Sequence, residues 1–104
     1  MKSLLNLDGK VAFVTGSIRG IGWATTKILA QHGATVILND LNDEVLLQSR
    51  LDELRTFSNA DFDGYLFDVG DYAQVKESYS TIFKKYKRLD ISVNTSETLD
   101  AMLL

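Results

Sequence analysis

Short apolar runs alternate with longer amphipathic stretches along this chain of 104 residues. The apolar runs predict four strands, at residues 10–15, 34–38, 65–69 and 89–94. Between successive runs, apolar side chains recur every three or four residues, which is typical of helices with one buried face. Because strands that alternate with helices are typical of βαβ units, the pattern predicts an α/β fold built on a parallel sheet.

Each of the three predicted helices has an identifiable end and a face expected to be buried. The first ends at Gly33, the second begins after Asn42, and the third begins at Asp71, where Gln74 completes a pattern similar to a capping box. The positions expected to be buried are Ile21, Thr25, Ile28 and Leu29 in the first helix, Leu47, Leu51 and Leu54 in the second, and Val75, Tyr79, Ile82, Phe83 and Tyr86 in the third.

A glycine-rich turn joins the first predicted strand to the first predicted helix. It reads Thr-Gly-Ser-Ile-Arg-Gly-Ile-Gly over residues 15–22, with glycines at Gly16, Gly20 and Gly22. The first backbone N–H groups of a helix lack intrahelical partners, so they attract an anion such as a pyrophosphate. Glycines let the turn be tight and let the phosphates and the strand come close. The turn is therefore the main candidate for a phosphate-binding site.

The spacing of the turn resembles the T-G-x-x-x-G-x-G motif of the short-chain dehydrogenase/reductase family. Two further segments are similar to the same family: Asp68-Val69 resembles its aspartate–hydrophobic pair, and residues 89–94 resemble its L-D-I-L-V-N strand, so that Asn94 matches the start of its N-N-A-G motif. The resemblance is to the N-terminal, cofactor-binding half, most closely of the 3-oxoacyl-[acyl-carrier-protein] reductase type. It implies a Rossmann-like three-layer fold and an NAD(P)-dependent oxidoreductase that transfers hydride between nicotinamide and a ketone or alcohol.

The candidate cofactor-binding residues follow from the turn and from this resemblance. They are Gly16, Ser17, Arg19, Gly20, Ile21, Gly22, Asp40, Asp68, Val69 and Asn94. Asp40 follows the second predicted strand, close to the spacing of about 20 residues at which an acidic side chain accepts hydrogen bonds from the adenosine ribose. A carboxylate there repels a 2′-phosphate, whereas Arg19 could pair with one. We weight Asp40 more heavily and expect NAD, with NADP the less favoured cofactor.

The chain departs from the family pattern after Asn94. Thr95, Ser96 and Glu97 stand in place of N-A-G, which puts a side chain and a negative charge near the cofactor and weakens its expected binding. The serine, tyrosine and lysine of the family's catalytic half have no counterpart, so no catalytic residue is assigned. Tyr72 and Lys76 match the letters of its Tyr-x-x-x-Lys pair but follow the third strand, not the fifth.

Residues 1–104 are therefore expected to form an incomplete Rossmann domain, truncated after the fourth strand, with sheet order 3-2-1-4. The first two helices are expected on one face of the sheet and only the third on the other. An undercovered face and an open fourth strand predict self-association or pairing with a full-length relative. The chain alone is expected to be inactive. The alternatives are a binding-only dinucleotide module and a truncated gene product without function.

The amino-acid composition further narrows the type of protein and its expected partners. With 45% hydrophobic residues, 24% charged residues and a net charge of −3, the chain is typical of one soluble globular domain. The acidic balance and scattered charges indicate neither nucleic acid nor an anionic membrane as a partner. No signal peptide or membrane-spanning run is found, so a cytoplasmic location is expected.

Metal sites are not expected. The chain has no cysteine and one histidine, His32, which argues against zinc or iron and allows no disulfide. His32 itself is interpreted as a residue at a helix C-terminus. Asn59, Asp61 and Asp63 resemble the start of a calcium loop, but Gly70 stands where such a loop needs a glutamate.

Overall fold

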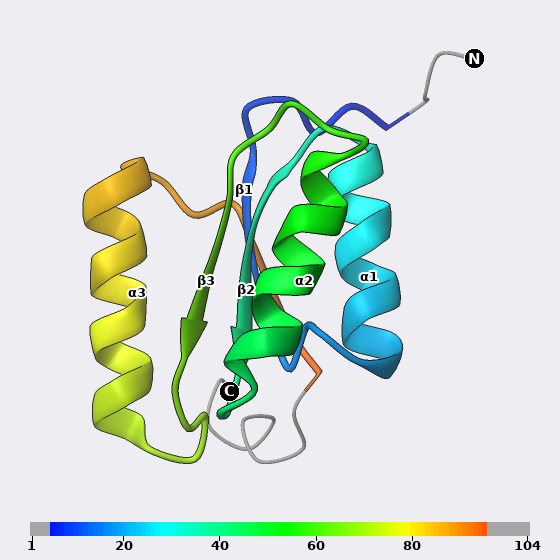
Figure 1. Ribbon diagram of the computed structural model, residues 1–104. Coiled ribbons are helices and arrows are strands. Elements are labelled where there is room, and N and C mark those ends of the chain that lie inside the picture. The colour runs from blue at the N-terminus through cyan, green and yellow to red at the C-terminus, as the bar shows by residue number, and fades with distance from the viewer. Residues whose placement is uncertain (1–4, 96–104) are drawn as a thin grey trace.

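The computed structural model describes residues 5–95, which form one parallel sheet with helices on both faces (Figure 1). The elements in chain order are β1 (Val11–Thr15), α1 (Gly20–Gln31), β2 (Thr35–Asp40), α2 (Glu44–Arg55), β3 (Phe62–Leu66), α3 (Tyr72–Tyr86) and β4 (Ile91–Asn94). The sheet order is β3-β2-β1-β4, and every pairing is parallel. The predicted α/β class and the predicted 3-2-1-4 order are confirmed.

The helices divide between the two faces of the sheet as expected. Figure 1 shows α1 and α2 together on one side and α3 alone on the other. Val14 and Leu38 join the buried cluster that includes α1 and α2 side chains, whereas Phe13 and Ile37 join the cluster that includes Val75 and Ile82 of α3. Alternate residues of β1 and β2 thus enter opposite layers, which explains why both strands are continuously apolar.

Several strand boundaries differ from the predictions, and the largest differences are in β2 and β3. β2 continues through Asn39 and Asp40, because these residues still pair with Tyr65 and Leu66 of β3. β3 begins at Phe62, inside the predicted loop, and ends before Asp68 and Val69. As an edge strand, β3 needs no continuous apolar run, so its polar start was not recognised.

Three features of the helices also differ. Phe83 of α3, predicted to be buried, is 55% exposed. Ile21 and Ile28 of α1 are 80% and 54% exposed, and the buried residues of this helix are instead Gly22, Trp23, Thr26 and Ala30. The small residues face the sheet because α1 lies very close to the turn at Gly22. At α2 the N-cap is Asp43, whose side chain accepts from Leu46 N, and not Asn42. The predicted buried leucines of α2 and the Asp71 cap of α3 are confirmed.

β4 is tied to β1 by a side chain as well as by backbone. Asp90 N donates to Val11 O, and the Asp90 carboxylate accepts from Val11 N, both at 2.9 Å. Hydrogen bonds from the Arg88 guanidinium and from Val11 N lower the pKa of Asp90 to about 2. Further along β4, the Ser92 hydroxyl lies 2.8 Å from the Tyr79 hydroxyl, which supplies the partner that a polar residue in a strand requires.

This arrangement predicts an acid-dependent loss of stability. Because the folded-state pKa of Asp90 lies below the unfolded value of about 3.9, its carboxylate stabilises the fold above that pH and less so as pH falls toward 2. We expect the urea midpoint of wild type to fall between pH 4 and pH 2, and Asp90→Asn to show a smaller fall over the same interval. Equal falls in both proteins would contradict this role of Asp90.

None of the helices within residues 5–95 combines the length and the hydropathy that crossing a membrane requires.

Candidate functional site

The carboxyl ends of the strands meet at one edge of the sheet, and the glycine turn lies there. Gly16 and Gly20 have φ values of +59° and +54°, which favour glycine. α2 and α3 have aspartate N-caps, Asp43 and Asp71, but the N-cap position of α1 is Arg19, which makes no side-chain cap, and the first turn of α1 holds no acidic residue. The first turn of α1 therefore keeps its positive end available to an anion.

The turn packs directly against the first residues of α1. A Cβ on Gly22 would lie 2.0 Å from Gly16 O and 2.9 Å from Thr95 Oγ1, so no other residue fits. A Cβ on Gly20 would meet nothing within 4 Å, so the backbone there borders open space. One glycine thus allows the helix to approach the turn, and the other leaves the turn accessible.

Asn39 holds the turn to the sheet, and sequence reasoning missed it. Its Oδ1 accepts from Gly16 N at 3.1 Å, and its Nδ2 donates to Asp40 O at 3.2 Å, Phe67 O at 3.3 Å and Tyr65 O at 3.4 Å. The side chain is almost fully buried, 1% exposed. A polar residue at the end of a buried apolar run was the available signal, because such a residue must find partners.

Ser17 makes a second set of contacts with the backbone of Asn39. Asn39 N donates to Ser17 Oγ at 2.7 Å, and Ser17 N donates to Asn39 O at 3.0 Å. Ser17 is fully buried, so its hydroxyl faces the protein. These contacts hold Ser17 to β2.

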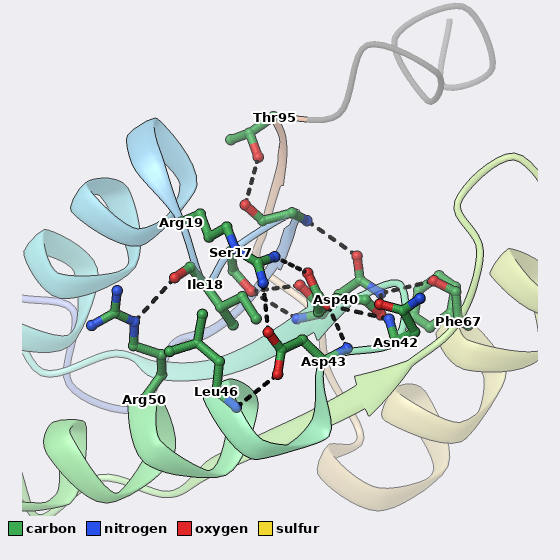
Figure 2. A network of polar contacts seen from close by, with 12 residues as sticks. Ser17, Ile18, Arg19, Asp40, Asn42, Asp43, Leu46, Arg50, Phe67 and Thr95 are labelled. Atoms are coloured by element: carbon green, nitrogen blue, oxygen red, sulfur yellow. Dashed lines mark hydrogen bonds and ion pairs between the residues drawn. The ribbon is translucent and has the colours of Figure 1, made fainter.

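Arg50 reaches the turn from α2. Its Nε donates to Ile18 O at 3.0 Å, and its guanidinium lies 4.5 Å from the centre of the Trp23 ring. Figure 2 shows this side chain extending from α2 toward Ile18. This cation–π contact and hydrogen bond connect two helices to the turn, and no local sequence pattern indicated them.

The charged residues of the site converge on Arg19 (Figure 2). Its guanidinium lies 3.1 Å from Asp40 Oδ1 and 2.6 Å from Asp43 Oδ2. Asp40 Oδ2 accepts from Asn42 N at 3.1 Å and Asp43 N at 2.8 Å. From the sequence, Asp40 favoured NAD and Arg19 favoured NADP, as if the two acted separately. In the structure the two side chains form an ion pair with each other.

A cleft of about 250 Å³ opens beside these residues. It is lined by Gly16, Asn39, Asp40, Leu41, Phe67, Asp68 and Val69. The structure therefore brings Asp68 and Val69 next to the turn, although both lie beyond β3 in a loop. Polar groups at the turn and apolar side chains at Leu41 and Val69 suit a flat ring attached to a polar chain.

A larger hollow, of about 740 Å³, lies at the other edge of the sheet and includes His32, Gly33 and Phe57. It adjoins the C-terminus of α1, where the helix dipole is negative, so it suits phosphates poorly.

Residues 59–63, which resemble a calcium loop, run into β3, and the Asp63 carboxylate accepts from Lys85 Nζ at 2.7 Å. Within residues 5–95, no group of three or more acidic or histidine side chains is arranged to hold a metal ion.

Asn94 and Thr95 connect the end of β4 to the turn. Thr15 Oγ1 donates to Asn94 Oδ1 at 3.0 Å, and Thr95 Oγ1 donates to Thr15 O and, at 3.2 Å, to Gly16 O. Ser96 and Glu97 lie outside the described residues. Tyr72 begins α3 and is 67% exposed, and α3 lies on the face opposite α1 (Figure 1).

Comparisons with known proteins identify the family and the fold. Residues 10–97 match the family model described as short chain dehydrogenase. The chain is 41% identical to the 3-oxoacyl-[acyl-carrier-protein] reductase FabG of Thermotoga maritima over 101 residues, which cover 96% of this chain and 40% of that protein. It is 38% identical to the 15-hydroxyprostaglandin dehydrogenase [NAD(+)] of Rattus norvegicus, covering 88% of this chain and 35% of that one.

Solved structures show the same fold. The L-sorbose reductase of Gluconobacter frateurii, solved with NADPH and L-sorbose, has a TM-score of 0.82 at 26% identity, covering 90% of this chain and 35% of that one. The carveol dehydrogenase of Mycobacterium avium, solved with NAD, has a TM-score of 0.79 at 26% identity, covering 88% and 36%. The chain thus spans less than half the length of these relatives, and it belongs to the short-chain dehydrogenase family.

Proposed function

We propose that residues 5–95 bind the adenosine and pyrophosphate of NAD(H) within an oxidoreductase that acts on a ketone or an alcohol. The observation that carries this proposal is the close packing of Gly22 on Gly16 at the start of a helix without a side-chain cap. Such a turn offers backbone N–H groups and the positive end of the helix to a pyrophosphate. The open space over Gly20 provides the room that the phosphates need.

The remaining candidate residues would hold the adenosine. In this proposal the adenine ring occupies the 250 Å³ cleft between Leu41 and Val69, and Asp40 accepts from the ribose hydroxyls at its border. Asn39, Ser17 and Arg50 would position the turn without touching the cofactor. When bound, the nicotinamide ring supplies or accepts the hydride.

We propose NAD(H) as the preferred cofactor. The Asp40 carboxylate lies at the cleft and would repel a 2′-phosphate there. Arg19, the cation that could pair with such a phosphate, is already held by Asp40 and Asp43. The net charge of Arg19, Asp40 and Asp43 is −1, which favours the uncharged 2′-hydroxyl of NAD(H) over the 2′-phosphate of NADP(H).

The described residues supply binding groups but no proton donor at the cleft. Tyr72 and Lys76, which match a catalytic pair in letters alone, belong to α3, and Tyr72 is largely exposed. This observation favours, as the second candidate, a binding-only dinucleotide module. A 3-oxoacyl group is the substrate suggested by the similarity to the Thermotoga maritima reductase, and the catalytic side chains would lie outside residues 5–95.

Titration of the chain with NADH tests the binding role. We expect saturable enhancement of nicotinamide fluorescence, displaced by AMP but not by nicotinamide mononucleotide, because the proposed contacts are with the adenosine and the adjoining phosphates. Absence of saturable binding up to millimolar NADH would contradict the proposal and favour a product without function. Oxidation of NADH on addition of a ketone would contradict the binding-only alternative.

A further inference from the structure

The Asp40 carboxylate has little capacity left for a ribose. An ionised carboxylate offers about four acceptor positions. Asp40 Oδ2 accepts from the backbone N–H groups of Asn42 and Asp43, and Asp40 Oδ1 accepts from Arg19. About one position therefore remains for the two adjacent hydroxyls of an adenosine ribose. The backbone contacts belong to the β2–α2 turn, so the contact that can be released is the one from Arg19.

Asp43 gives Arg19 a second partner. Its Oδ1 accepts from Leu46 N at 3.0 Å and so caps α2, which fixes the orientation of the carboxylate. Its Oδ2 lies 2.6 Å from Arg19 Nη2, a shorter contact than the 3.1 Å from Arg19 Nη1 to Asp40. Figure 2 shows the Arg19 side chain spanning the two carboxylates. Arg19 can therefore leave Asp40 and remain bound to Asp43.

A 2′-phosphate would need the opposite rearrangement. Arginine binds phosphate through two parallel N–H donors, so Arg19 would have to turn both terminal nitrogens toward the ligand. Each of those nitrogens now faces a carboxylate, and the side chain of Asp43 is only 35% exposed. The contact with Asp43 therefore holds Arg19 against the start of α2 and opposes its pairing with a phosphate.

We infer that Asp43 is a specificity-determining residue, which favours NAD(H) over NADP(H) by retaining Arg19 at the α2 N-terminus. The inference rests on the proposed function, since it concerns how the same site selects its cofactor. Asp40 acts by accepting from the ribose and repelling the phosphate. Asp43 acts one step further away, by determining where the nearest cation lies.

The test compares NADPH and NADH affinities of wild type and Asp43→Asn. Asparagine is as good an N-cap as aspartate, so the variant keeps α2 while losing the Asp43 charge, one of the two that hold Arg19. We expect the ratio of the NADPH to the NADH dissociation constant to fall about tenfold, because a charge-assisted contact with the 2′-phosphate becomes available. Asp43→Ser, which also caps a helix, provides a second variant without the carboxylate.

The matched control is Asp52→Asn, which removes the same charge from an exposed position on the same helix, where Asp52 lies 3.4 Å from Arg55. We expect it to leave the ratio of affinities unchanged. Arg19→Gln should abolish the effect of Asp43→Asn on that ratio. If Asp43→Asn changes the ratio no more than Asp52→Asn does, the specificity role is wrong and the proposed function stands. If wild type binds neither dinucleotide, the proposed function fails and this inference fails with it.

Discussion

Gly22→Ala should abolish saturable NADH binding and lower the free energy of unfolding by about 3 kcal/mol, at the upper end of the range for an overpacked core. The added Cβ would lie 2.0 Å from Gly16 O and 2.8 Å from Gly16 C, which are backbone atoms that no rotamer change can move away. Either α1 or the turn must shift. In both cases the N–H groups proposed to bind the pyrophosphate leave their position.

The expected loss of stability in Gly22→Ala is opposite in sign to what helix propensity predicts. Alanine in a helix interior is more stable than glycine by about 1 kcal/mol, so helix propensity alone predicts a gain in stability. Urea unfolding followed by the fluorescence of Trp23, the chain's single tryptophan, measures the change. Equal stability and affinity in wild type and Gly22→Ala would contradict the close packing.

Gly9→Ala is the control for the binding effect. Gly9 has a φ of +81°, so alanine there costs about 1 kcal/mol of backbone strain, but an added Cβ would meet no atom within 4 Å. The substitution therefore lowers stability without pushing α1 away from the turn. We expect Gly9→Ala to bind NADH as wild type does, which separates loss of the site from a general loss of stability.

Asn39→Asp should destabilise the fold by about 3 kcal/mol at neutral pH, although it replaces only the amide nitrogen by oxygen. Gly16 N would keep its acceptor, but the carbonyls of Asp40, Tyr65 and Phe67 would face a carboxylate oxygen instead of an N–H donor. With Gly16 N as its donor and three carbonyls facing its other oxygen, burial disfavours the charged form of this carboxyl. The connection between the turn and the loop after β3 would be lost, and NADH affinity with it.

The pH dependence of the stability of Asn39→Asp identifies the cause of its destabilisation. Burial would raise the folded-state pKa of the new carboxyl above its unfolded value of about 3.9, so the destabilisation should be small below that pH and grow as pH rises. Urea midpoints of wild type and variant at pH 4 and pH 7 measure the difference. Asn59→Asp, at an exposed loop position, is the matched control and should cause little change at either pH. A loss in Asn39→Asp that is the same at both pH values would argue against burial of a charge as its cause.

The sequence predicted best those features that depend on neighbouring residues. The glycine spacing located the turn, the apolar runs located β1 and β2, and the recurrence of Leu47, Leu51 and Leu54 identified the buried face of α2. The sheet order followed from the handedness of the connections. Each of these features is specified by a local pattern or by a rule that does not depend on side-chain packing.

Features that depend on contacts between distant segments were missed. Asn39 looked like the end of a strand because its partners, Gly16 and Phe67, are far away in the sequence. The buried face predicted for α1 was wrong because close packing at Gly22, and not the recurrence of isoleucines, sets which side of that helix is buried. The apposition of Arg19 and Asp40 was also missed, since each was considered separately as a contact of the cofactor.

We propose that the carboxyl edge of the sheet, and not another part of the molecule, binds the adenosine and pyrophosphate of the cofactor. The most direct test is to follow an NADH titration by the backbone amide signals of the isotopically labelled chain. We expect the largest shifts at residues 16–22, 40–43 and 67–69. Shifts concentrated around His32 and Phe57, at the larger hollow on the opposite edge, would contradict the claim.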